Sequence, residues 1–174
     1  MSRDRGALSL VLHSHMPYVE GFGTWPFGEE WLWEAVSCVY LPLIDLLSEL
    51  GAPVTLGVTP VLCDQLEALP GEAGERLLAF LRDTRRAVHE EDSNGLDDTG
   101  HPELAAEVRR AAGDYERASA DLETSRDVIR RLARLKEVEL WTSAATHALL
   151  PLLATDAGMR LQLATGVSLS LIHI

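Results

Sequence analysis

Two histidines spaced two residues apart close a short apolar run near the N-terminus, and they constrain the fold more than any other feature. The run ALSLVLH at residues 7–13 predicts a β-strand that is buried on both faces. Alternate strand residues share a face, so His13 and His15 should point the same way, opposite to Ser14. Pro17 has no N–H to donate and ends the ladder. Both imidazoles are therefore expected at the carboxyl end of a strand, where α/β folds place their ligands.

A loop rich in glycine, proline and aromatic residues follows this pair. It spans residues 16–28, and loops longer than about 12 residues in compact domains are usually functional. Trp25, Trp31 and Trp33 lie in or just after it. Indole rings stack on sugar faces and their N–H groups take polar partners, so these residues fit a carbohydrate pocket as well as a plain core. A lone histidine is usually a packing residue, but two on one face beside clustered tryptophans favour a binding site.

The next segment reads as a helix followed by a second strand and a short helix. Two glutamates at 29–30 suit a helix N-terminus. The helix should run to about residue 41, kink or restart at Pro42 and end near Gly51. VTLGV at 54–58 is rich in β-branched residues and predicts a strand. Thr59 and Pro60 form a good N-cap and N1 pair for a helix over 61–69. This alternation of strand and helix implies parallel pairing and an α/β class.

Two long polar-faced helical stretches separate the second strand from a third. The pattern predicts helices over 72–90 and 103–135, the latter with apolar residues at spacings of three and four from Leu104 to Leu122. EEDSNGLDDTGHP, at 90–102, reads as a solvated turn between them, more typical of a polar surface than of a calcium loop. About sixty helical residues exceed a simple crossover, so they predict a helical insertion.

VELWTS at 138–143 predicts the third strand. If all three strands are parallel, it delivers Thr142 and Ser143 to the same end of the sheet as His13 and His15. His147 lies just beyond, in a small-residue turn where backbone can approach a ligand closely. Alone it would be a helix-start or packing residue, but its position suggests the same pocket as the first pair.

Charge and cysteine content exclude several classes of partner. The formal charge of −12 and pI near 4.8 argue against nucleic acid and anionic membranes, and are compatible with a neutral ligand. Cys38 and Cys63 make no CxxC motif or disulfide framework. With no continuous run of about 18 apolar residues and no signal-peptide pattern, the expectation is a single domain, or part of a larger one, in the cytoplasm, without a membrane partner.

Two blocks of sequence form recognisable motifs. The first is HSHMPYV followed by GTWPFGEEWLWEA, and the second is WTSAATHALLPLL followed by Gln162 and Gly166–Val167. Both blocks resemble the family 57 glycoside hydrolases, and more narrowly their 1,4-α-glucan branching enzymes, and TPVL at 59–62 is a third, weaker match. The longer part of the first block favours branching enzymes over the amylases and 4-α-glucanotransferases of the same family.

The resemblance implies a fold, an activity and a set of site residues. The fold would be the N-terminal part of an incomplete (β/α)7 TIM-like barrel over residues 1–168, with a helical insertion between strands 2 and 3. The intact protein would move an α-1,4-glucan segment to a 6-hydroxyl with retention, without cofactor or metal. Binding of the α-glucan would involve His13, His15, Trp25, Trp31 and His147.

The same resemblance places the catalytic carboxylates outside this chain. A retaining pair stands about 5–5.5 Å apart, and the family's Glu nucleophile and Asp acid/base are expected downstream of Val167. No carboxylate in this chain is expected to act as the nucleophile or the acid/base. Glu20, Glu29 and Glu30 are interpreted as loop and helix-start residues. The chain alone is thus expected to be inactive, with exposed strand edges that put stable folding in doubt.

Two alternatives from other classes stay open. An HxH pair ending a first barrel strand also resembles metal-dependent amidohydrolases, although the one lysine, Lys136, precedes the third strand rather than ending one. The chain could also be a small α/β protein that binds glucan without chemistry.

The final residues LSLIHI, 169–174, do not match the rest of the composition. They hold two of the four isoleucines in a chain that otherwise uses fourteen arginines against one lysine, as a GC-rich genome encodes. The DNA string CTG TCT CTT ATA CAC ATC encodes this hexapeptide and resembles a transposon end used in tagmentation libraries. These residues are expected to be a non-native tail, so His173 should have no functional role.

Overall fold

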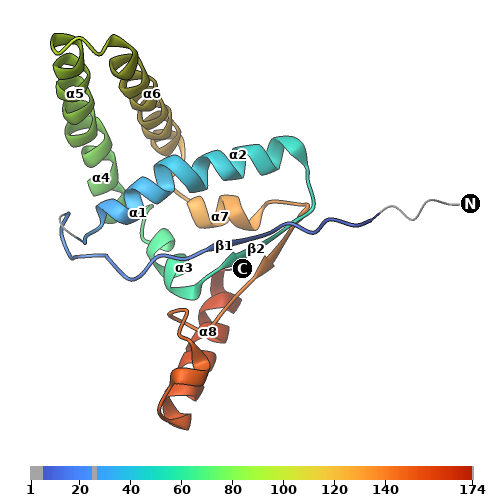
Figure 1. Cartoon of the computed structure of the whole chain (residues 1–174). Coiled ribbons are helices and arrows are strands. Elements are labelled where there is room, and N and C mark those ends of the chain that lie inside the picture. The colour runs from blue at the N-terminus through green and yellow to red at the C-terminus, as the bar shows by residue number, and fades with distance from the viewer. Residues whose placement is uncertain (1–5, 25–26, 174) are drawn as a thin grey trace, which may run out of the picture.

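A three-stranded parallel sheet organises the chain, as Figure 1 shows. The computed structural model describes residues 6–24 and 27–173, so Trp25 lies outside the described residues. The strands are β1 (Val11–Ser14), β2 (Val54–Val58) and β3 (Val138–Trp141), in the order β1-β2-β3. In the register, His13 pairs with Gly57, and Gly57 with Trp141. The predicted α/β class and parallel pairing are confirmed.

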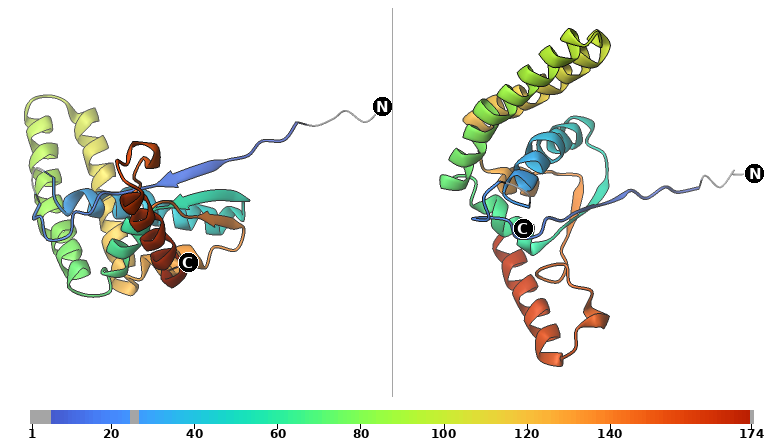
Figure 2. Two further views of the ribbon diagram at one scale, coloured as in Figure 1. Left: turned by 90° about the horizontal axis from the view of Figure 1, so that it is seen from below. Right: turned by 60° about the vertical axis from the view of Figure 1, so that its left-hand side comes forward.

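Helices make up most of the rest. In chain order they are α1 (Glu30–Ala35), the π-helical η1 (Val36–Tyr40), α2 (Leu41–Leu50), α3 (Pro60–Glu67), α4 (Glu72–Ala79), the π-helical η2 (Phe80–Arg85), α5 (Arg86–Asp98), α6 (Pro102–Thr124), α7 (Val128–Ala133), the short 3-10 turn η3 (Leu150–Leu152) and α8 (Asp156–His173). Helices α5 and α6 project together away from the sheet, and α8 extends on the other side of the molecule (Figures 1 and 2).

The central strand is buried and the first strand is not. Val54, Leu56 and Val58 of β2 belong to the core. In contrast, Leu8 is 97% exposed and Val11 is 55% exposed. The prediction that residues 7–13 are buried on both faces is therefore wrong, because β1 is an edge strand and no described element covers these side chains.

The first helical run, Glu30–Leu50, is continuous but contains a π-helical segment. Segment η1 forms the turn that ends at Tyr40, two residues before Pro42. The nitrogen of Pro42 has no hydrogen to donate to that turn, and the wider π-helical turn accommodates it. The run ends as predicted at Gly51, which has φ 56° and donates its N–H to the Leu47 carbonyl at 3.0 Å. By length and composition alone this run could cross a membrane, although the sequence contains no uninterrupted apolar stretch of that length. Of its most apolar 18 residues, 44% are buried inside the fold.

The helical insertion differs from its predicted boundaries. Helices α4, η2 and α5 run without interruption to Asp98, so the solvated turn predicted over 90–102 is wrong and only a short link around Gly100 (φ 80°) remains. The stretch 103–135 is two helices, because Asp127 starts α7 by accepting the Arg130 N–H at 3.1 Å. Ala118 and Leu122 join the core as predicted, whereas Leu104 is exposed.

Candidate functional site

Three imidazoles from separate parts of the sequence lie together at the carboxyl end of the sheet. The ring centroids of His13 and His15 are 6.5 Å apart and nearly parallel, as expected for alternate residues of a strand. His147, in the loop after β3, lies 4.5 Å from His13 and 5.0 Å from His15. His13 and His147 are exposed and His15 is half-buried. The structure thus brings together all three histidines singled out in the sequence.

The side chain of His15 contacts the N-cap residue of helix α3. Its Nδ1 lies 3.2 Å from the Oγ1 of Thr59, whose side chain is fully buried. Burial, followed by the neighbouring His147 and His13, lowers the pKa of His15 below its usual 6.5. A neutral imidazole that can donate or accept a hydrogen bond is therefore the form that this site favours near pH 7.

The absence of a side chain at Gly57 leaves room for the imidazole ring of His13. It faces His13 across the β1–β2 pair, and a Cβ at Gly57 would lie 3.0 Å from the His13 Nδ1. A larger residue in β2 would therefore push the ring of His13. The sequence showed only a glycine inside a strand, which is typical of a close approach by another group.

The loop carrying His147 has a strained but well-anchored backbone. His147 has φ 57°, a conformation that non-glycine residues rarely adopt, and its N–H donates to the Ala144 carbonyl at 2.9 Å. Gln162 of α8 accepts the Thr146 N–H at 3.0 Å. Gly166, also on α8, fits against the loop so closely that a Cβ would come within 2.7 Å of the Ser143 carbonyl oxygen. Helix α8 thus fixes the position of His147. Gln162 and Gly166 serve this structural role, because they hold the loop against α8.

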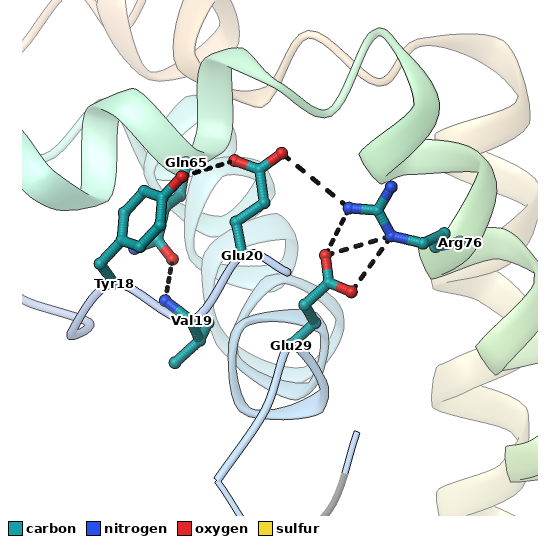
Figure 3. A network of polar contacts seen from close by, with 6 residues as sticks. All are labelled: Tyr18, Val19, Glu20, Glu29, Gln65 and Arg76. Carbon is teal, nitrogen blue, oxygen red and sulfur yellow. Dashed lines mark hydrogen bonds and ion pairs between the residues drawn. The ribbon is translucent and has the colours of Figure 1, made fainter. Parts of the chain in front are cut away.

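A buried glutamine anchors the loop that follows the histidine pair, as Figure 3 shows. Gln65 of α3 is 1% exposed and accepts the Val19 N–H at 2.7 Å. Its amide group donates to the carbonyls of Pro17 and Val61, each at 3.1 Å. The bond to Val19 satisfies the N–H of a buried residue, which would otherwise lack a partner. Sequence reasoning missed Gln65, because a polar residue on a short helix carries no sign that it points inward.

The far end of the same loop is fixed by an ion pair. Glu29 is buried at the N-terminus of α1 and accepts hydrogen bonds from Arg76 of α4, with the Nε 3.1–3.2 Å from the two carboxylate oxygens. Glu20 lies on the other side of the guanidinium at 3.9 Å (Figure 3). The hydrogen bond and charge of Glu29 raise the pKa of Arg76. These contacts agree with the structural role expected for both glutamates.

The tryptophan side chains pack elsewhere, and the two hydroxyl candidates bond to groups other than the histidines. Trp33 is a core residue, and Trp31, 42% exposed, stacks edge-on against Phe27 with centroids 5.2 Å apart. Trp31 lines a cavity of about 380 Å³ with residues of η2 and α5, none of which is a histidine of the cluster. The hydroxyls of Thr142 and Ser143 contact Ser170 and the Ala144 carbonyl respectively.

The cluster offers imidazole nitrogens for hydrogen bonding. Within 6–24 and 27–173, no group of three His, Cys, Asp or Glu side chains is arranged to hold a metal ion. The groups that shift the pKa of His15 are two imidazoles and no carboxylate. Cys38 and Cys63 are free thiols, and burial raises the pKa of Cys63 to about 11, so it is a poor nucleophile near pH 7. Imidazole nitrogens on an open surface can bind the hydroxyl groups of a polar, uncharged ligand.

Sequence comparisons point to one class of relatives. No family model matches the chain. It is 37% identical, over 94% of its length, to a 1,4-α-glucan branching enzyme of Thermococcus kodakarensis. A probable 1,4-α-glucan branching enzyme of Mycobacterium tuberculosis is 43% identical over 36% of the chain and 13% of that relative. The chain spans about a quarter of the Thermococcus relative, 24% of its length.

Comparison with solved structures identifies the same class of relatives. A GH57-type branching enzyme from Pyrococcus horikoshii matches 97% of the chain and 32% of its own length, with a TM-score of 0.82 and 31% identity. The GH57 branching enzyme of Thermococcus kodakaraensis, solved in complex with glucose, gives a TM-score of 0.73 at 36% identity over 97% of the chain and 31% of its own length. An α-amylase from Thermotoga maritima, 22% identical, shares the fold with a TM-score of 0.77 over 97% of the chain and 33% of that enzyme.

Proposed function

We infer the function from one premise, that this chain is similar to the N-terminal part of the glycoside hydrolase family 57 branching enzymes, and propose that it belongs to a 1,4-α-glucan branching enzyme. The whole protein would cleave an α-1,4 bond and transfer the segment, with retention, to a 6-hydroxyl of an acceptor chain. The observation that carries this proposal is the cluster of His13, His15 and His147 at the carboxyl end of the parallel sheet.

The three imidazoles would bind the hydroxyls of an α-glucan. Their rings lie within 6.5 Å of one another on an accessible surface, and an uncharged His15 can donate or accept a hydrogen bond without attracting an ion. Trp31 would add an aromatic wall farther along the glucan, since its exposed ring lies in a different cavity. We extend the same role to Trp25, which precedes Trp31 in the same sequence block.

The sheet would form the beginning of a larger barrel. Residues 1–168 would supply the first strands of a (β/α)7 barrel, and α4–α6 would be an insertion after the second strand. The exposed side chains of β1 fit a strand with a further neighbour in the whole protein. Residues 169–174 would be an adapter-derived tail, and sequencing the source DNA across codons 160–175 tests that assignment.

Catalysis would require the part of the protein after Val167. The Glu nucleophile and the Asp acid/base would come from there, and this chain alone would be inactive. Glu20 and Glu29, two carboxylates of the loop, form ion pairs with Arg76, which supports a structural role for both. The physiological role would be glycogen or related α-glucan synthesis in the cytoplasm, with no cofactor.

The test is a product analysis with the whole protein and amylose. Branching predicts new α-1,6 linkages, measured as reducing ends that isoamylase releases from the product. A 4-α-glucanotransferase would change chain lengths without these linkages, and an amylase would release reducing ends without isoamylase. Maltoheptaose binding by the 174-residue chain without any activity of the whole protein would instead support a non-catalytic glucan-binding protein.

The amidohydrolase alternative makes a different prediction. It requires a stoichiometric metal ion that is lost together with activity, which elemental analysis of the whole protein measures. A branching enzyme of the proposed kind keeps its activity in the presence of a chelator.

A further inference from the structure

Thr59 occupies the N-cap position of α3 but does not use its side chain as a cap. Its backbone is extended, with φ −74° and ψ 143°, as expected for an N-cap residue, yet its hydroxyl accepts no N–H of the first helical turn. The Leu62 and Cys63 N–H groups bond to the Thr59 carbonyl instead, at 3.0 and 3.1 Å. The hydroxyl points to His15, with Oγ1 and Nδ1 3.2 Å apart. The sequence predicted the N-cap but not this partner.

Burial determines the direction of this hydrogen bond. Thr59 is 0% exposed, and Nδ1 of His15 is its one side-chain partner among the residues that the structure describes. A hydroxyl that accepted from Nδ1 would leave its own hydrogen buried without an acceptor, which costs about 1–3 kcal/mol. The hydroxyl therefore donates and Nδ1 accepts. A neutral histidine whose Nδ1 accepts carries its proton on Nε2.

We propose that Thr59 is a positioning residue that fixes His15 as the Nε2–H tautomer, so that this histidine presents a hydrogen-bond donor to the ligand. The contact spans 44 residues and joins the residue after β1 to the start of α3. The other titratable groups that act on His15 are His13 of β1 and His147 of the loop after β3, and both disfavour its charged form. The donor would bind an oxygen atom of the glucan, a role that rests on the proposed function.

The experiment first measures the tautomer without any ligand. Long-range ¹H–¹⁵N NMR spectra of the protein with labelled histidine, at pH 8, show which nitrogen of His15 bears the proton. The proposal predicts Nε2–H in the wild type and in the matched control Thr59→Ser, which keeps the hydroxyl. In Thr59→Val, which has nearly the same shape, the tautomers should mix. An Nδ1–H wild type, or an unchanged tautomer in a folded Thr59→Val, would overturn the proposal.

A second measurement links the tautomer to the ligand. In the whole protein, Thr59→Val should raise the KM for amylose on the order of 3- to 10-fold, the loss expected for one hydrogen bond, with a smaller change in kcat. Thr59→Ser should stay within about twofold, because it keeps the donor. If the NMR spectra show the expected tautomers but neither the wild type nor Thr59→Val acts on amylose, the proposed function is wrong and the role of Thr59 remains supported. If both act on amylose and Thr59→Val keeps the wild-type KM, the positioning role is wrong.

Discussion

Replacing Gln65 by methionine is expected to destabilise the protein strongly, although the two side chains have similar volumes. The substitution removes the acceptor of the buried Val19 N–H and the donors to the carbonyls of Pro17 and Val61. The Val61 carbonyl keeps its backbone hydrogen bond within α3, so the main loss of stability comes from the groups of Val19 and Pro17. An unsatisfied buried group costs about 1–3 kcal/mol, and the lost bond to Pro17 adds about 1 kcal/mol, so the free energy of unfolding should fall by about 2–4 kcal/mol.

Urea denaturation followed by circular dichroism measures this change, with Gln162→Met as the matched control. Gln162 makes comparable bonds to Thr146 near the surface, where water can replace them, so its loss should stay below about 1 kcal/mol. Hydrogen exchange at the Val19 amide should accelerate in Gln65→Met. A stability for Gln65→Met within about 0.5 kcal/mol of the wild type, or equal losses in both variants, would refute the reasoning.

Three further predictions concern the same region. Gly57→Ala should displace the ring of His13, seen as changed NMR shifts of that imidazole, while stability stays within about 1 kcal/mol, because a methyl group in a strand has little other cost; unchanged shifts would contradict this. Arg76→Met should cost about 1–3 kcal/mol in urea denaturation at pH 7, since it leaves the carboxylate of Glu29 buried while the arginine itself is 40% exposed; a combined Glu29→Gln and Arg76→Met protein should recover part of the loss. The lowered pKa of His15 means that the unfolded chain binds its proton more readily, so stability should fall as the pH drops below 6.5, and His15→Gln should weaken that dependence in pH-dependent urea titrations.

The parallel sheet and the meeting of the three histidines could be predicted because they depend on local patterns. Strand period places His13 and His15 on one face, and parallel pairing of β1 and β3 with the central β2 brings the end of β3 to the same end of the sheet. Gly51 ends its helix through backbone chemistry that is independent of tertiary context.

The contacts that hold the site could not be predicted, because they join residues far apart in the sequence. From the sequence, Gln65 and Arg76 look like ordinary surface residues of helices. Their contacts with the loop depend on how the helices pack in the fold. The acidic stretch 90–98 looked like a turn by composition, yet it continues α5, since charged residues are tolerated on an exposed helix that packs against α6. Exposure of β1 was missed because an apolar run does not show which neighbours cover it.

The most direct test of the glucan assignment is the linkage analysis of amylose treated with the whole protein, in wild-type form and as the His13→Ala, His15→Ala and His147→Ala variants. The account predicts new α-1,6 linkages with the wild type and a loss of activity on the order of tenfold or more for each variant, because each removes a hydrogen-bonding group whose loss, with the reorganisation that follows, costs about 1.4 kcal/mol or more. Products without α-1,6 linkages, or three variants with wild-type activity, would contradict it.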